Sequence, residues 1–326
     1  LETPMLCIMN HQMAVATKAS RVCRATNRPV SEFGSRRAHG PWAATYGAKA
    51  AIIAGCSATS NILAGAKYDF GSTGTMAHSH VTSFGCSVEG EFKAFDTYVK
   101  THRGEPLIML IDTYDTLRCG ILNAMRAFRE NGIDDGYAPG YGVRLDSGDL
   151  AYLSRKARKM LDDAGYNDCR IIASNSLDEY IIRDILQQGA KIDSFGVGER
   201  LITSKSEPVF GGVYKLVALE DDEGRIVPKI KISENVAKIT TPYFKKIYRL
   251  FSKETGKAIA DVLTTCDEKI DDTKQSLNIN EKAIRKNQKR MSEGIINTNK
   301  YNKALVALKE RHGDASDAID TYGKGL

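Results

Sequence analysis

The stretch "YGVRLDSGDLAYLSRKARKMLDDAG", residues 141–165, predicts a strand that runs directly into a helix. Residues 141–146 form a short, mostly apolar run, which is typical of a buried strand. Residues 147–165 carry apolar side chains at helical spacing, with Ser147 as the expected N-cap and Gly165 just past the helix end. A strand followed by a helix of this length is typical of one repeat of a parallel α/β sheet.

The same alternation continues on both sides of this unit. The further expected elements are a strand at 106–112, a helix at 115–131, a strand at 170–174, a helix at 177–189 and a strand at 192–198. Strands that alternate with helices predict an α/β fold, either a parallel sheet or a barrel. In such folds ligands bind at the loops that follow the carboxyl ends of the strands. The candidate loops are 71–78, 144–149, 174–175 and 196–200.

The pattern changes after residue 212, and we expect three regions. Residues 1–215 form the α/β barrel core. Residues 216–270 form a smaller β-rich accessory region, because "GVYKLVALEDDEGRIVPKIKIS" (212–233) suggests antiparallel strands around the turn "DDEG". Residues 271–326 are polar, basic and rich in Asn and Lys, so we expect an exposed tail that is helical in part or disordered.

The composition disfavours several classes of protein. Hydrophobic residues make up 42% and charged residues 26% of the chain, as in soluble globular proteins, and no apolar run approaches the roughly 18–20 residues of a membrane span. The net charge of +6 is spread along the chain, so we expect small anionic ligands rather than nucleic acid. Seven cysteines without a CxxC pair disfavour a disulfide scaffold or structural zinc and favour a reducing cytoplasm.

The run "GVRLDSGDL" (142–150) places Arg144 near the end of a predicted strand, with Asp146 and Asp149 on either side of a Ser-Gly turn. Backbone N–H groups at the following helix start favour anions, and the carboxylates suit ribose hydroxyls or Mg²⁺. The alternative is that these side chains only cap the helix, which is a common task for Asp and Ser.

Two further strand ends carry similar residues. In "FGVGERLITS" (195–204), Gly196 and Gly198 would let the backbone approach a phosphate, and Glu199 follows them. After another strand come Ser174 and Asn175. Each signal is weak alone, since two spaced glycines are often a turn and a Ser-Asn pair is often a cap.

Adjacent arginines stand in "SEFGSRRAHG" (31–40). Arg36 and Arg37 suit phosphate or pyrophosphate, because guanidinium groups bind such oxygens through paired N–H donors. A solvated surface loop is the alternative interpretation.

The loop "DFGSTGTMAHSH" (69–80) combines glycines, hydroxyls and two histidines, and residues 70–80 contain no carboxylate. Such a loop is receptive to anions, with His78 as a candidate nucleophile for a phosphoryl group. A metal site at His78 and His80 is the alternative. It needs further ligands, because zinc takes three or four protein side chains.

Taken together and in this order, seven segments resemble the nicotinate phosphoribosyltransferase family. The resemblance covers roughly residues 1–265, and the ordered set of motifs is far more specific than any one of them. The segments are "EFGSRRAHG", "FGSTGTMAHSHVTSFG", "IDTYDT", "GVRLDSGDL", "ASNSLDEYII", "FGVGERLITS" and "GGVYKLV".

The resemblance implies a fold and a reaction. The fold is an irregular α/β barrel of the type II phosphoribosyltransferase kind with a smaller, β-rich accessory region, in a homodimer with sites near the subunit interface. The reaction joins nicotinate and phosphoribosyl pyrophosphate to give nicotinate mononucleotide and pyrophosphate, in salvage toward NAD. It implies that ATP is hydrolysed through a phosphorylated histidine and that Mg²⁺ is used.

The resemblance also implies roles for single residues. His78 matches the phosphorylated histidine, Thr75 and Arg144 match nicotinate-binding positions, and Glu199 matches a position beside phosphoribosyl pyrophosphate. Less specific matches to phosphate, ribose or metal contacts are Arg36, Arg37, Asp146, Ser174, Asn175, Gly196 and Gly198.

Two departures from the family lead us to expect a partial or divergent chain. An aromatic residue of the family's N-terminal segment has no counterpart before Leu1, and the C-terminal region is not recognisable after about residue 272, so we expect low turnover. The other interpretations are a nicotinamide-using phosphoribosyltransferase, a non-catalytic nucleotide-binding fragment and an unrelated α/β-barrel phosphate-binding enzyme. An acidic residue in the 70–80 loop would favour the amide substrate, and that loop has none.

Overall fold

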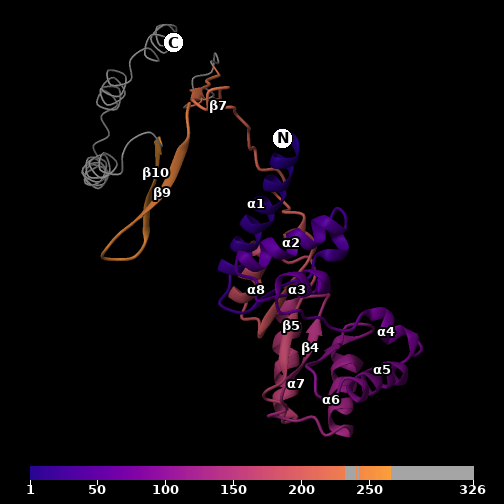
Figure 1. The fold of residues 1–326 in the computed structure, drawn as a ribbon. Coiled ribbons are helices and arrows are strands. Elements are labelled where there is room, and N and C mark those ends of the chain that lie inside the picture. Colours follow the sequence, from indigo (N-terminus) through magenta and orange to yellow (C-terminus); the bar gives the residue numbers. More distant parts are fainter. Residues whose placement is uncertain (232–239, 241, 266–326) are drawn as a thin grey trace. The chain divides into compact units, whose positions relative to one another are not determined.

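The computed structural model describes residues 1–231, 240 and 242–265 (Figure 1). The chain divides into two compact units, Leu1–Val213 and Tyr214–Leu326. The tail expected at 271–326 lies outside the described residues. The predicted functional loops all fall in the first unit.

A six-stranded sheet forms the centre of the first unit, with strand order β2-β1-β6-β5-β4-β3 and only parallel pairs. Strand β1 pairs with β2 on one side and with β6 on the other, so the first and last strands of the sequence order are neighbours, as in a barrel. Among the described residues the ring stays open, because β2 and β3 do not pair. The sheet is thus a curled half-barrel, and the predicted α/β class is confirmed. The strands are β1 (Val30–Glu32), β2 (Ala58–Thr59), β3 (Leu107–Leu110), β4 (Tyr141–Leu145), β5 (Arg170–Ala173) and β6 (Ser194–Val197).

Helices follow most strands, as the alternation predicts. Figure 1 shows α4, α5 and α6 grouped beside one another and α1 lying against α2, and α1 also packs on α8 and α9. The helices are α1 (Glu2–Arg24), α2 (Pro41–Ile53), α3 (Ile62–Tyr68), α4 (His78–Ser83), α5 (Val88–Thr101), α6 (Ile121–Glu130), α7 (Leu150–Asp163), α8 (Glu179–Gln187) and α9 (Glu199–Ile202), with a 3₁₀ turn η1 (Ser35–Arg37) and a π-helical turn η2 (Thr116–Gly120).

The N-cap of α7 is Asp149, so the prediction of Ser147 was wrong. The Asp149 carboxylate accepts a hydrogen bond from the backbone N–H of Tyr152 at 2.9 Å. Gly148 adopts a left-handed conformation with φ of 75°, and this turn delays the helix start beyond Ser147. The hydroxyl of Ser147 donates instead to the Asp112 carboxylate.

The edge strand β3 is buried along its whole length, and all four of its residues belong to the core. Helix α5 packs against it. The side chains of the core include large aromatic rings that fix the helices on the sheet, namely Phe95, Phe128, Phe195 and Tyr141.

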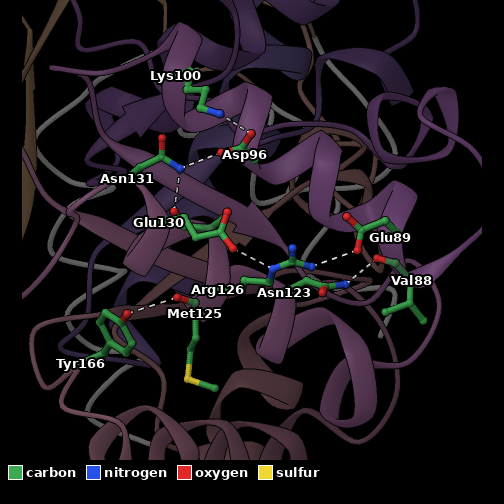
Figure 2. Close-up of polar contacts among 11 residues, drawn as sticks. Val88, Glu89, Asp96, Lys100, Asn123, Met125, Arg126, Glu130, Asn131 and Tyr166 are labelled. Carbon is green, nitrogen blue, oxygen red and sulfur yellow. Dashed lines mark hydrogen bonds and ion pairs between the residues drawn. The ribbon is translucent and has the colours of Figure 1, made fainter.

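Polar contacts join α5 to α6, as Figure 2 shows. Asn123 donates to the backbone carbonyl of Val88 at 2.9 Å. Arg126 bridges Glu89 and Glu130, each at 2.9 Å. A separate pair of contacts joins Asn131 to Asp96 at 2.8 Å and Lys100 to Asp96 at 2.6 Å. The Tyr166 hydroxyl also donates to the carbonyl of Met125 on α6 at 3.2 Å. The α5–α6 pair is therefore held in a fixed position beside β3.

A close backbone contact joins η2 to the end of β3. A Cβ atom at Gly120 would lie 1.8 Å from the carbonyl oxygen of Ile111. Only glycine can be accommodated at this distance. Asp112, the residue that follows Ile111, comes directly after this contact.

The amino ends of β4 and β5 are tied together by the Asp135 carboxylate. It accepts hydrogen bonds from the backbone N–H of Asp168 at 2.8 Å, from the Tyr141 hydroxyl at 2.7 Å and from Asn167. These hydrogen bonds lower the pKa of Asp135 from 3.8 to about 2, and the bond from the Asp168 N–H has the largest effect. Desolvation of the carboxylate acts in the opposite direction. The ionised form of Asp135 is thus favoured by the folded state.

The sign of this shift predicts a pH effect on stability. Because the pKa of Asp135 is lower in the folded than in the unfolded protein, the ionised carboxylate stabilises the fold fully above about pH 4. This contribution to the free energy of unfolding is lost as the pH falls through about 2. For Asp135→Asn we expect a melting temperature below that of the unsubstituted protein at neutral pH. The difference should shrink between pH 4 and pH 2, measured by circular dichroism.

Asp134→Asn is the matched control, because Asp134 is the adjacent aspartate, is likewise exposed, and its carboxylate bonds to no described residue. We expect its melting curve to follow that of the unsubstituted protein at every pH. If the Asp135→Asn difference stayed constant with pH, the stabilising role of the ionised carboxylate would be wrong.

The second unit contains two antiparallel pairs within its described residues. Strands β7 (Ala218–Glu220) and β8 (Ile226–Pro228) pair around the predicted "DDEG" turn, which is confirmed. Strands β9 (Lys245–Phe251) and β10 (Ala258–Thr265) form the other pair. None of the helices in the described residues is long and apolar enough to cross a membrane.

Candidate active site

A cavity of about 790 Å³ lies at the loops that follow the carboxyl ends of the strands in the first unit. It brings together all the residues matched to the family's site positions, whereas Asp149, the other carboxylate considered for ribose or Mg²⁺, caps α7 and does not line the cavity. Those residues are Arg36, Arg37, Thr75, His78, Arg144, Asp146, Ser174, Asn175, Gly196, Gly198 and Glu199.

Arg144 projects from β4 into the cavity, where polar groups hold its guanidinium. Its Nε donates to the Ser174 hydroxyl at 3.0 Å, its Nη1 donates to the Thr75 hydroxyl, and its Nη2 lies 3.4 Å from the Asp146 carboxylate. Ser174 in turn donates to Asp146, so the three groups fix one another. The guanidinium has more N–H donors than these contacts use, and the remaining ones are available to a planar anion.

An aromatic ring, Phe33, lines the same cavity beside Arg144. The centre of the guanidinium lies 5.9 Å from the centre of the ring. The ring packs on Gly196, where a Cβ atom would lie 2.4 Å from Phe33 Cδ2. The lack of a side chain at Gly196 therefore makes room for a ring, whereas the sequence suggested room for a phosphate.

The strand before Phe33 is fixed by a buried carboxylate. Glu32 accepts hydrogen bonds from the Thr59 hydroxyl at 2.7 Å and from the backbone N–H of Gly34. Burial raises the pKa of Glu32, and these two bonds oppose the rise. The contacts tie β1 to β2 just before the η1 turn that carries Arg36 and Arg37.

His78 is the first residue of α4 and lies at the cavity wall. Its Nε2 is 3.1 Å from Oδ1 of Asp112, and Ser147 donates to the other oxygen of that carboxylate. Asp112 is buried, with 2% of its side chain exposed, whereas 44% of the His78 side chain is exposed. Because the Asp112 carboxylate accepts the hydrogen bond of the Nε2–H group, Nδ1 takes no part in this contact and its lone pair is free.

Neither Asp112 nor Phe33 was predicted from the sequence as a site residue. Both lie in segments quoted for the resemblance, and Asp112 follows a fully buried strand, which is where the fold class puts ligand-binding residues. The position of Asp112 directly after a buried strand was therefore enough to predict it as a site residue.

His80 points away from the cavity. Its Nε2 lies 3.3 Å from the carbonyl of Ala94, and its ring packs edge-on against Phe84 and Tyr98. His78 and His80 therefore do not converge on one point. Within the described residues, no group of three or more His, Cys, Asp or Glu side chains could hold a metal ion.

Charged groups line the outer part of the cavity. Arg36 and Arg37 lie on η1, are exposed, and their side chains bond to no described residue. Glu199 is exposed and lies 3.9 Å from the ammonium of Lys205. Asn175 and Ser176 adopt positive φ values of 94° and 49°, a strained conformation that is typical of binding loops.

A curled parallel sheet that carries a polar cavity over its carboxyl edge is the arrangement of the type II phosphoribosyltransferases. Residues 29–249 match the model of the nicotinate phosphoribosyltransferase (NAPRTase) family, and residues 244–300 match the C-terminal domain of nicotinate phosphoribosyltransferase. The second match extends past residue 272, so the expectation that the family's C-terminal region is not recognisable beyond that position was wrong. The chain belongs to the nicotinate phosphoribosyltransferase family.

Curated relatives agree with this assignment. The chain is 47% identical over 276 residues to a nicotinate phosphoribosyltransferase of Bacillus subtilis (strain 168), covering 84% of this chain and 54% of that protein. It is 34% identical over 321 residues to one of Caenorhabditis elegans, covering 82% of this chain and 56% of that protein. The chain thus spans about half the length of these relatives.

Two solved structures share the fold. A nicotinate-nucleotide pyrophosphorylase from Pyrococcus furiosus matches with a TM-score of 0.61 and 26% identity, covering 82% of this chain and 62% of that one. Human nicotinic acid phosphoribosyltransferase matches with a TM-score of 0.64 and 25% identity, covering 82% and 58% respectively.

Proposed function

We propose that the protein transfers the phosphoribosyl group of phosphoribosyl pyrophosphate to nicotinate, which gives nicotinate mononucleotide and pyrophosphate in NAD salvage. The observation that carries the proposal is the gathering of the family's motif residues around one cavity. The names of the relatives support the same activity.

The charges around the cavity suit this displacement. Breaking the bond to pyrophosphate places positive charge on the ribose and negative charge on the leaving group. Preorganised groups of the opposite sign stabilise such charges in the transition state. Asp146 and Glu199 supply carboxylates for the ribose side, and Arg36 and Arg37 supply cations for the phosphates.

Arg144 and Phe33 are suited to hold the pyridine ring of nicotinate. The free N–H donors of Arg144 pair with the substrate carboxylate, while Phe33 offers a ring face at the same wall. Thr75 fixes Arg144 from the other side. A neutral amide would gain less from the guanidinium, so the arrangement favours nicotinate over nicotinamide.

ATP, Mg²⁺ and a second subunit belong to the same proposal. His78 would accept the γ-phosphoryl group of ATP on Nδ1, because Asp112 holds Nε2. Mg²⁺ commonly binds through phosphates and one or two carboxylates, and Asp146 is placed to supply one. It would neutralise phosphate charge there.

The proposal also includes a homodimer in the cytoplasm. Trp42 on α2 and Ile62 on α3 are 71% and 76% exposed, Ile62 lines the cavity, and α2 packs on α3. Exposed apolar side chains beside a site are typical of a subunit contact. The free thiols of the described cysteines support a reducing compartment.

A product assay tests the proposed function. Purified protein is incubated with Mg²⁺, ATP, phosphoribosyl pyrophosphate and either isotopically labelled nicotinate or nicotinamide, and the mononucleotides are separated chromatographically. We expect nicotinate mononucleotide as the main product, with tighter binding of nicotinate than of nicotinamide by calorimetry. Preference for nicotinamide, or neither product nor binding, would contradict the proposal.

Arg144→Lys should weaken substrate recognition while the fold persists. Lysine keeps the charge but loses the planar group and the paired donors, so we expect kcat/KM for nicotinate to fall roughly 10- to 100-fold, mostly through KM. The melting temperature should change little, because the side chain faces the cavity.

Arg183→Lys on α8 is the matched control, since Arg183 is exposed and outside the cavity. Steady-state kinetics and melting curves of both variants check the expectation. Unchanged nicotinate KM in Arg144→Lys would show that another residue recognises the carboxylate.

A further inference from the structure

Two thiols from distant parts of the sequence touch in the first unit, away from the cavity. Cys23 lies in the last turn of α1, and Cys56 lies between α2 and β2. Their sulfur atoms are 3.8 Å apart, and no other described cysteine pair is in such contact. A Cβ atom at Gly55 would lie 3.6 Å from Cys23 Cβ, so the two backbones approach closely.

We propose that Cys23 and Cys56 form a reversible disulfide when a hydroperoxide reaches the protein. The sulfurs need to approach by about 1.8 Å to reach the S–S bond length. Cys23 is half-buried and therefore accessible to a small oxidant, whereas Cys56 is 5% exposed and protected.

The step balances with hydrogen peroxide as the oxidant. The Cys23 thiolate attacks one peroxide oxygen, which gives a sulfenic acid and hydroxide. The Cys56 thiol then attacks the sulfenic sulfur, and water leaves as the S–S bond forms. The hydrogen bond from Cys56 lowers the pKa of Cys23 despite burial, and the same contact with burial raises the pKa of Cys56, so Cys23 is the first to react.

The crosslink would staple the end of α1 to the segment that enters β2. Next to Cys56, Ser57 bonds to the carbonyl of Val30 through its backbone N–H at 2.8 Å and its hydroxyl at 3.1 Å. The staple therefore joins α1, β1 and β2, and it closes a loop between positions 33 residues apart. Such a link restricts the unfolded chain, so we expect the oxidised protein to melt several degrees higher.

Peptide mapping of the unsubstituted protein tests the proposal without relying on any variant. The protein is treated with hydrogen peroxide, free thiols are alkylated, and the digest is analysed without reductant. We expect a linked peptide pair containing Cys23 and Cys56 that dithiothreitol separates. If both residues are recovered unlinked at a peroxide dose that oxidises the exposed Cys7, the proposal is wrong.

Variants add a second readout. The peroxide-induced rise in melting temperature should disappear in Cys23→Ala and in Cys56→Ala and persist in Cys7→Ala, the control in the same helix as Cys23. If the linked peptide forms without any rise in melting temperature, the disulfide does not stabilise the attachment of α1 to β1 and β2, and that part of the proposal is wrong.

Discussion

His78→Ala is expected to abolish the stimulation of mononucleotide synthesis by ATP while it leaves synthesis from nicotinate and phosphoribosyl pyrophosphate. The displacement at the ribose needs no phosphorylated histidine, so a basal rate should remain. With γ-labelled ATP, the unsubstituted protein should acquire an acid-labile, base-stable label that the variant lacks. The contact of Nε2 with Asp112 predicts further that the phosphoryl group resides on Nδ1, which phosphorus NMR of the digested protein distinguishes from the other isomer.

His80→Ala is the control, because the His80 ring packs against Phe84 and Tyr98 and does not line the cavity. The His80→Ala protein should still acquire the phosphoryl label and should still be stimulated by ATP, even if its melting temperature falls. Label retained in His78→Ala would show that another residue is phosphorylated.

Gly120→Ala is expected to cause a large loss of stability. In most helices this change stabilises, because alanine has the higher helix propensity. Here the added Cβ would lie 1.8 Å from the carbonyl oxygen of Ile111, which is main chain and cannot rotate away. Overpacking of this kind costs about 3 kcal/mol or more, which corresponds to a melting temperature roughly 10 °C lower for a unit of this size.

Denaturant unfolding measures the loss directly. Gly211→Ala is the matched control, since no atom lies within 4 Å of a Cβ added there, and its free energy of unfolding should change by no more than about 0.5 kcal/mol. Equal stability of the two variants would mean that the backbone at Gly120 does not approach the Ile111 carbonyl so closely.

The repeating units of the first domain were predictable because each is a local pattern. The strands β3 to β6 and helices α6 to α8 follow from apolar runs, helical spacing and capping residues within single segments. The antiparallel turn at 221–224 was predictable for the same reason. In contrast, β1 and β2 were missed, because three- and two-residue strands have too few positions to show a period.

The site residues were predictable as a set, and their partners were not. Strand ends rich in Gly, Ser, Asp and Arg indicate a ligand edge, and the ordered motifs named the residues. The contacts of His78 with Asp112 and of Gly196 with Phe33 join segments far apart in the sequence, so no local pattern specifies them. The choice of Asp149 over Ser147 as cap depended on the conformation of Gly148 between them.

The Asp135 contacts lie at the amino ends of β4 and β5, whereas the cavity lies at the opposite ends of the same strands. The two groups of side chains share no described partner. Free-energy changes at well-separated sites without shared partners add almost independently. Substrate preference and acid tolerance can therefore diverge separately among descendants of such a protein, because a substitution that alters one leaves the other nearly untouched.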